Sequence, residues 1–343
     1  MVRCREMSQA ILDRMATVMN DTRFLLVRLL VLPVLAFLPA RLAFDAARRR
    51  GRRRYGRLSR DVKNRMRREV EQVCGHVGEG RIEAILQEHV EILSCDEMDA
   101  YLILRLGRRG FDRIISLEGL NHLEEATRSG KGAILFSAHF GGGYAFLAAL
   151  GARGYRLYGI GAPIDQLPLD QRAVLRIRKA LIGWASNGEV LFMGRHSLGH
   201  EVLARLREGA LIYVLLDVRP DSRAKRTIAV EFLGRQCRLS YGMLDLAARR
   251  GVPVLPFFVF YTAPHLRRAV IGAPVELVAD RDPEVARRIN LRRCLERIEE
   301  AISLAPSHWM LWGNFEGLWS CGAEAAELTV ASHGSTPTTA RPT

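Results

Sequence analysis

His139 is the residue of this chain whose position most favours chemistry. It follows an apolar run over 133–138, which predicts a buried strand, and it precedes three consecutive glycines: Gly141, Gly142 and Gly143. A backbone without side chains lets a substrate approach closely, and the helix predicted over 144–150 would present N–H groups and partial positive charge to a developing anion. An imidazole at such a strand end can act as a base.

A purely structural role for His139 is the competing interpretation, because a histidine at the end of a buried strand is often only a satisfied core or capping residue. The glycines favour the functional interpretation, since three of them cost backbone entropy that a simple turn does not require. Their spacing does not match the dinucleotide fingerprint, and no Gly-Lys-Ser/Thr follows them. The sequence therefore does not favour a phosphate-binding loop.

The positive charge of the chain is concentrated in one segment. The formal charge is +14 over 343 residues, and residues 48–69 hold eleven Arg and one Lys against Asp61 and Glu69. A nucleic-acid-binding face usually spreads its basic residues and interleaves aromatics, whereas Tyr55 is the only aromatic residue of this run. We therefore expect no nucleic-acid partner. The alternative, RNA binding by the arginines, would predict salt-sensitive binding and no lipid partner.

An apolar segment, residues 24–44, directly precedes the arginines. Its longest uncharged piece, residues 29–40, is twelve residues long, whereas a straight bilayer span needs about 20. The segment therefore predicts a marginal span or an interfacial helix, with membrane lipids as partners and the arginines against anionic headgroups. Positive charge on the C-terminal flank would keep the remaining chain on the cytoplasmic side. The alternative is a buried core helix followed by a solvated charged face.

The remaining chain predicts an α/β fold. Residues 61–112 have apolar positions at helical spacing, and after them short β-rich runs alternate with helical stretches. The predicted strands are 113–117, 133–138, 156–160, 190–193, 211–216, 227–232, 252–260 and 269–278, and the predicted helices are 121–129, 168–184, 197–208, 239–250 and 283–304. We expect a central sheet flanked by helices, with three segments: an anchor and polybasic segment (1–60), a catalytic domain (61–320) and a disordered tail (321–343).

Several short motifs together resemble the bacterial lipid A biosynthesis acyltransferases. They are residues 117–123, 130–135, 138–141, 216–217, 230–235 and 306–312, with the apolar segment and its arginine-rich flank. The resemblance implies a mostly parallel sheet of the glycerolphosphate-acyltransferase type and a fatty acyl thioester as donor, on acyl carrier protein or coenzyme A. It implies no metal and no further cofactor, and a location on the cytoplasmic face of the bacterial inner membrane.

In that family the histidine opens an H-x4-D/E motif, in which the carboxylate orients and charges the imidazole that deprotonates the acceptor. Here the acid position holds Tyr144, which is neutral near pH 7 and cannot stabilise an imidazolium as a carboxylate would. Three alternatives follow. Another acid substitutes, with Asp217 and Glu231 as candidates; the acceptor is a better nucleophile, such as an amine; or the site binds without catalysing.

The acceptor side also departs from the family. Where the family has His-Arg-Arg-Phe-Lys after its tryptophan block, this chain has Gly-Asn-Phe-Glu at 313–316, without cations suited to phosphorylated sugars. Lipid A itself is therefore not favoured as the acceptor. The candidate substrate-binding residues elsewhere are Arg176, Arg178, Glu231 and Gly234 besides the three glycines, and Arg219 is a further candidate anion contact.

These observations predict a membrane-associated acyltransferase that moves a fatty acyl group from a thioester to a lipid or metabolite. His139 is the expected base, with Tyr144 and Asp217 as the other catalytic candidates. The alternative is a non-catalytic lipid-binding or scaffold protein that keeps the fold. Consumption of a thioester separates the two.

Overall fold

The computed structural model describes residues 26–75, 77–161, 169–192, 197–218, 220 and 226–314. Its strands are β1 (Ile115–Glu118), β2 (Ala133–Ser137), β3 (Leu157–Gly161), β4 (Val190–Phe192), β5 (Leu211–Leu215), β6 (Thr227–Phe232), β7 (Arg235–Ser240), β8 (Val254–Ala263) and β9 (Leu266–Ile271). The larger helices are α3 (Ala40–Gly56), α4 (Arg60–Cys74), α5 (Glu79–Gly110), α7 (Gly143–Ala152), α8 (Leu169–Ser186) and α11 (Pro283–Leu304). Shorter ones are η1 (Val27–Val31), α2 (Leu32–Ala36), η2 (Phe111–Arg113), α6 (Leu120–Thr127), α9 (Leu198–Arg207), α10 (Gly242–Arg250) and η4 (Pro306–His308).

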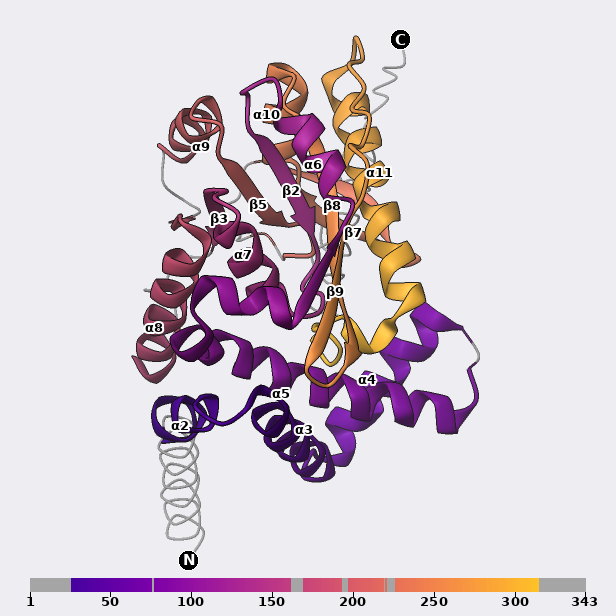
Figure 1. Ribbon diagram of the computed structural model, residues 1–343. Coiled ribbons are helices and arrows are strands. Elements are labelled where there is room, and N and C mark those ends of the chain that lie inside the picture. The colour runs from indigo at the N-terminus through magenta and orange to yellow at the C-terminus, as the bar shows by residue number, and fades with distance from the viewer. Residues whose placement is uncertain are drawn as a thin grey trace, which may run out of the picture.

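The central sheet has seven strands in the order β1-β9-β8-β2-β5-β3-β4. The strands from β8 to β4 run parallel, whereas β9 returns antiparallel to β8 and β1 runs parallel to β9. Helices lie against the sheet, with α7 and α8 on one side and α11 on the other (Figure 1). The expectation of a mostly parallel sheet flanked by helices is confirmed.

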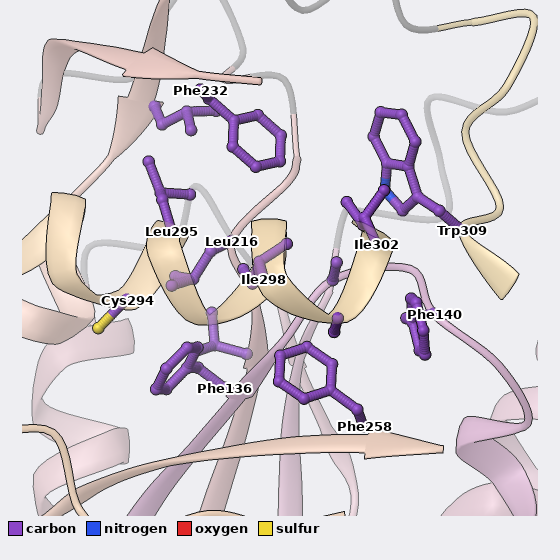
Figure 2. Packing of buried hydrophobic residues seen from close by; sticks show 14 of the residues in the cluster. Phe136, Phe140, Leu216, Phe232, Phe258, Cys294, Leu295, Ile298, Ile302 and Trp309 are labelled. Carbon is purple, nitrogen blue, oxygen red and sulfur yellow. The ribbon is translucent and has the colours of Figure 1, made fainter. Parts of the chain in front are cut away.

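The hydrophobic core has two parts, one on each face of the sheet. Along β2, Ile134 and Phe136 belong to one cluster and Ala133 and Leu135 to the other, as the alternation of a strand requires. Figure 2 shows the first cluster, in which buried side chains of α11 pack over Phe136 and Phe258: Cys294, Leu295, Ile298 and Ile302. Because both faces of β2 are covered, its position within the sheet is fixed.

Two strands differ from the sequence-based expectations. Strand β7 was not predicted, because a helix was expected from residue 239, whereas α10 begins at Gly242. Leu233 and Gly234 both adopt positive φ, 51° and 75°, so the loop between β6 and β7 is a tight two-residue hairpin turn. Strand β9 was predicted at 269–278 but spans Leu266–Ile271, because its antiparallel pairing with β8 begins at the hairpin and ends at Ile271, opposite Phe257.

The apolar segment near the N-terminus is not one continuous helix. Pro39, which lacks a backbone N–H, stands at the N-cap of α3 and separates it from α2. Both α2 and α3 pack on α5, through buried side chains such as Leu32 and Phe44. Within the described part of the chain, no helix combines the length and the apolar character needed to cross a bilayer.

Part of the arginine run is neutralised inside the protein. Arg48 and Arg52 pair with Glu91 of α5, at 2.6 and 3.4 Å. Glu97, one helical turn and a half further along α5, receives three more guanidinium groups: Arg28, Arg50 and Arg54. These ion pairs fasten α3 to α5. Arg67 of α4 pairs with Glu79 and Glu83, whereas Arg49 and Arg53 of α3 are exposed.

A fully buried ion pair joins α5 to β9. Arg267 Nη2 lies 2.5 Å from Asp99 Oδ1, and both side chains are 0% exposed. The Arg267 guanidinium also lies 4.2 Å from the ring centroid of Phe44 and 4.5 Å from that of Tyr261, whose hydroxyl donates to Asp99. One buried cation therefore connects α3, the long helix α5 and the sheet.

Removing one partner of this pair should destabilise the fold strongly, because it leaves the other charge buried and unpaired. We expect Asp99→Ala to lower the free energy of unfolding by about 3–5 kcal/mol. The matched control is Asp112→Ala, which breaks the exposed Asp112–Arg153 pair and should cost less than about 1 kcal/mol. Urea denaturation followed by circular dichroism measures both, and equal losses would contradict the structural role of Asp99.

Candidate active site

The site forms where two neighbouring parallel strands end. Ser137 of β2 is paired with Leu215 of β5, so His139 and Asp217, each two residues further along, arrive side by side. His139 Nδ1 lies 2.9 Å from Asp217 Oδ1, and the backbone N–H of His139 donates to Asp217 Oδ2 at 2.8 Å. The carboxylate thus contacts both the ring and the backbone of the histidine.

Asp217 is held by three donors in a buried position. Besides the two contacts with His139, the indole Nε1 of Trp309 donates to Asp217 Oδ2 at 2.9 Å, and the Asp217 side chain is 0% exposed. An ionised carboxylate only accepts hydrogen bonds, so the proton of the neutral imidazole lies on Nδ1. Nε2 then carries the lone pair, on a side chain that is 37% exposed. This arrangement is that of a base with an orienting acid.

The pKa values of His139 and Asp217 are both shifted toward the charged forms. Burial lowers the pKa of His139, but the charge and hydrogen bond of Asp217, with a contribution from Asp96 of α5, outweigh it and raise that pKa above its ordinary value. Burial likewise acts to raise the pKa of Asp217, and the hydrogen bonds from His139 and Trp309 together with the charge of His139 reverse this, so the pKa is lowered. Asp217 is therefore ionised at neutral pH, and it stabilises an imidazolium form of His139.

Packing explains two of the three glycines next to the histidine. Gly141 has φ of +61°, and a Cβ there would lie 1.7 Å from the carbonyl oxygen of Val259 on β8. A Cβ on Gly142 would lie 2.9 Å from Asp99 Oδ2 of the buried ion pair, whereas one on Gly143 would meet no atom within 4 Å. Gly141 and Gly142 are thus required by the close approach of the loop to the sheet, and their predicted contact with substrate stays a prediction, as does that of Gly143.

A model of one protein family matches residues 18–314, and its description is bacterial lipid A biosynthesis acyltransferase. The chain belongs to this family. The family resemblance drawn from the sequence motifs is thereby confirmed, and with it a general relation to acyltransferases. A search among curated proteins found no match.

Tyr144 stands at the motif's acid position, and its predicted catalytic role stays a prediction. Tyr144 is the second residue of α7 and lies half-buried in the cluster that also contains Tyr213. The ring nitrogen that an orienting acid would contact is already occupied by Asp217. Of the two substitute acids considered, the structure brings Asp217 to the histidine.

Glu231, the other candidate acid, lies elsewhere. It is exposed on β6, and its carbonyl accepts a hydrogen bond from Arg292 of α11 at 3.0 Å. Its neighbour Phe232 faces the opposite way, with its ring centroid 6.3 Å from that of Trp309. Gly234 supplies the positive φ of the hairpin turn. The predicted substrate contacts of Glu231 and Gly234 remain predictions, and Phe232 of the hairpin packs edge to face on Trp309.

In the described part of the chain, none of the arginines predicted to bind substrate contacts His139. Arg176 is an exposed residue of α8. The side chain of Arg178 and the whole of Arg219 lie outside the described residues. Over the same described ranges, no group of three or more His, Cys, Asp and Glu side chains is arranged to hold a metal ion.

Trp309 is the site residue whose role the sequence did not indicate. Its segment was noticed only as part of the family resemblance, since an indole N–H that is directed at a carboxylate 92 positions earlier leaves no local pattern. His308, next to it, accepts a hydrogen bond at Nε2 from the backbone N–H of Tyr261 at 2.9 Å. Burial lowers the pKa of His308 to about 4, so this second histidine is neutral and structural.

The contact between His139 and Asp217 predicts the titration of the histidine. With Asp217→Asn the charge is lost and burial becomes the largest influence, so the pKa of His139 should fall below its ordinary 6.5. We expect the imidazole carbon signals in NMR, assigned with His139→Asn, to titrate at lower pH than in the parent. Glu231→Gln is the control and should leave the curve unchanged. A His139 pKa that is equal in parent and Asp217→Asn would contradict the pairing.

Proposed function

We propose that this protein is a membrane-associated acyltransferase that moves a fatty acyl group from a thioester, on acyl carrier protein or coenzyme A, to a lipid or metabolite acceptor. One observation carries the proposal: an open imidazole is oriented by a buried carboxylate, 2.9 Å away, at the carboxyl edge of a parallel sheet in a chain of this family. Such an edge is where α/β proteins usually bind their ligands.

In the proposed reaction His139 Nε2 removes the proton from the acceptor hydroxyl or amine as its oxygen or nitrogen attacks the thioester carbonyl. The tetrahedral intermediate then collapses, the carbon–sulfur bond breaks, and the imidazolium returns its proton to the leaving thiolate. Asp217 stays ionised throughout and stabilises the imidazolium. The start of α7 at Gly143, four residues after His139, brings the positive end of a helix dipole near the developing oxyanion.

The residues after the tryptophan block argue against a phosphorylated sugar as the acceptor. The N–H of Gly313 donates to the buried carboxylate of Glu69 on α4, and Arg65 donates to the carbonyl of Gly313. Gly313 thus binds α4, and the sequence places no Arg or Lys at 313–316. We therefore propose an acceptor that carries a hydroxyl or amine group but does not depend on phosphate recognition at this place.

Attachment to the membrane is proposed through the exposed apolar face of the N-terminal helices. Seven large apolar side chains there are between 37% and 69% exposed: Leu26, Leu30, Val31, Val34, Phe37, Leu38 and Leu42. Free-standing apolar patches of this kind mark interaction sites, and the exposed arginines Arg41 and Arg49 on α3 would suit anionic headgroups. The proposed location is the cytoplasmic face of the inner membrane.

Acyl transfer should depend on His139. The full chain, in detergent, is given acyl carrier protein and coenzyme A thioesters with a bacterial lipid and metabolite extract as acceptor. Thiol release and acylated products are measured by mass spectrometry. We expect His139→Ala to reduce turnover to background, and Asp217→Asn to reduce kcat by a factor on the order of 10³–10⁴, the loss known for the orienting acid of a related triad.

Tyr144→Phe is the matched control, because it removes only a hydroxyl at the motif's acid position and leaves the side chains of His139 and Asp217 unchanged. A lost neutral hydrogen bond of about 1 kcal/mol should slow turnover only several-fold. Activity of a folded His139→Ala variant within twofold of the parent would refute His139 as the base. If the parent consumes no thioester with any acceptor, the lipid-binding alternative becomes the better description.

Membrane binding should depend on the exposed face of α2 and the residue after it. We expect Val34→Glu combined with Phe37→Glu to abolish flotation with vesicles of phosphatidylethanolamine and phosphatidylglycerol, since each change puts a charge where an apolar side chain would insert. Leu304→Glu is the control, because Leu304 is 72% exposed but lies at the end of α11. Equal flotation of all three proteins in high salt would show that attachment lies elsewhere.

A further inference from the structure

The loop that carries His139 is clamped from a second side by residues close to the C-terminal end of the described chain. The backbone N–H of Met310 donates to the carbonyl of His139 at 2.8 Å, and that of Gly141 donates to the carbonyl of His308 at 3.0 Å. Between them Phe140 and Trp309 form an antiparallel bridge. We name residues 308–310 the strap. The catalytic loop is thus bonded to β5 through Asp217 and to the strap through its own backbone.

Trp309 connects the strap directly to the orienting acid. Its side chain is 0% exposed, and its Nε1–H donates to Asp217 Oδ2 at 2.9 Å. The same oxygen accepts the backbone N–H of His139, so Oδ1 is left to face the imidazole. The indole N–H and the backbone N–H of His139 thus share Oδ2, and the imidazole meets Oδ1.

The indole is itself held in place by its neighbours. The ring centroids of Trp312 and Phe232 lie 4.7 and 6.3 Å from that of Trp309, both with edge-to-face geometry. His308, the preceding residue, is fixed by the N–H of Tyr261 at the β8 side. Trp309 has little freedom to leave the carboxylate, because buried aromatic rings in such contacts are tightly packed.

We propose that Trp309 is a positioning residue of this site: its indole N–H, supplied by the strap, holds the Asp217 carboxylate in the orientation from which it directs His139. This inference rests on the proposed function for its kinetic consequences, but the positioning itself does not require turnover. The proposal gives the tryptophan block at 306–312 a role in the chemistry. Its indole supports a carboxylate that follows a strand end.

Other titratable groups near the His139–Asp217 pair could also influence the titration of His139. Asp96 of α5 acts on His139 with the same sign as Asp217. The strap brings His308 and α5 brings His89, and burial lowers the pKa of each to about 4, so both are neutral where His139 titrates. The Asp99–Arg267 pair lies behind Gly142 and is neutral as a unit. Changes at Trp309 should therefore reach His139 through Asp217.

The test compares Trp309→Phe with Trp312→Phe in the full chain. Phenylalanine keeps an aromatic ring but removes the N–H, so the charge of Asp217 is less neutralised and draws a proton to His139 more strongly. We expect the His139 titration in NMR to move to higher pH, opposite to the shift in Asp217→Asn. We also expect kcat to fall about tenfold with KM within twofold, as for the loss of one hydrogen bond to a charged group.

Trp312→Phe is the matched control, since Trp312 is buried at 3% exposure and its indole donates to a backbone carbonyl, that of Pro306, at 2.7 Å. It should leave the His139 titration unchanged. If a folded Trp309→Phe protein titrates like the parent, the inference is overturned. If the parent turns over no thioester but the titration of Trp309→Phe moves as expected, the proposed function fails and the positioning role stands.

If Trp309→Phe does not fold, the inference is tested by a measurement on the unmodified protein. The indole N–H signal of Trp309, assigned through sequential backbone connectivity in the unmodified protein, should shift with pH along the His139 titration curve, because the two groups share one carboxylate. The Trp312 signal should stay constant. A Trp309 signal that is flat across the titration would overturn the inference.

Discussion

The contact between His139 and Asp217 depends on the parallel pairing of β2 with β5. The register of the two strands places His139 and Asp217 next to each other. The buried carboxylate of Asp217 then requires hydrogen-bond donors, because an unpaired buried charge is costly. Three donors meet this requirement, two from His139 and one from Trp309. The same contacts that make the buried charge tolerable also orient the imidazole of His139.

Helix α5 links the N-terminal helices to the site. Glu91 and Glu97 receive arginines that include four from α3, while Asp99 holds Arg267 against the ring of Phe44 on α3. Asp96, on the same helix, acts electrostatically on His139. Helix α5 therefore contacts both α3 and the loop that carries His139, where Asp99 lies behind Gly142.

The acid of this site comes from a strand end and not from the helix that follows the histidine. A strand end of the parallel sheet is a rigid position, since β5 lies between β2 and β3 with neighbours on both sides. Tyr144, at the family's acid position, is left to pack in the core cluster. The glycines of the loop follow from the same geometry, because Gly141 and Gly142 approach β8 and the buried ion pair too closely for any side chain. The conformation of the loop is thus set by β8 and by the buried ion pair, which it contacts.

The sequence by itself determined the alternation of strands and helices, the family and the histidine, because periodicity and short motifs are local properties. Asp217 could be named only as one of two acids, and the hairpin strand β7 and the early start of β9 were missed, since pairing partners set their limits. Only the tertiary structure decided that Asp217 pairs with His139, that Glu231 does not, and that Trp309 donates to the carboxylate. It also showed that several arginines expected at a membrane are neutralised by α5. These are contacts between residues tens to hundreds of positions apart, and chain folding, not local pattern, brings them together.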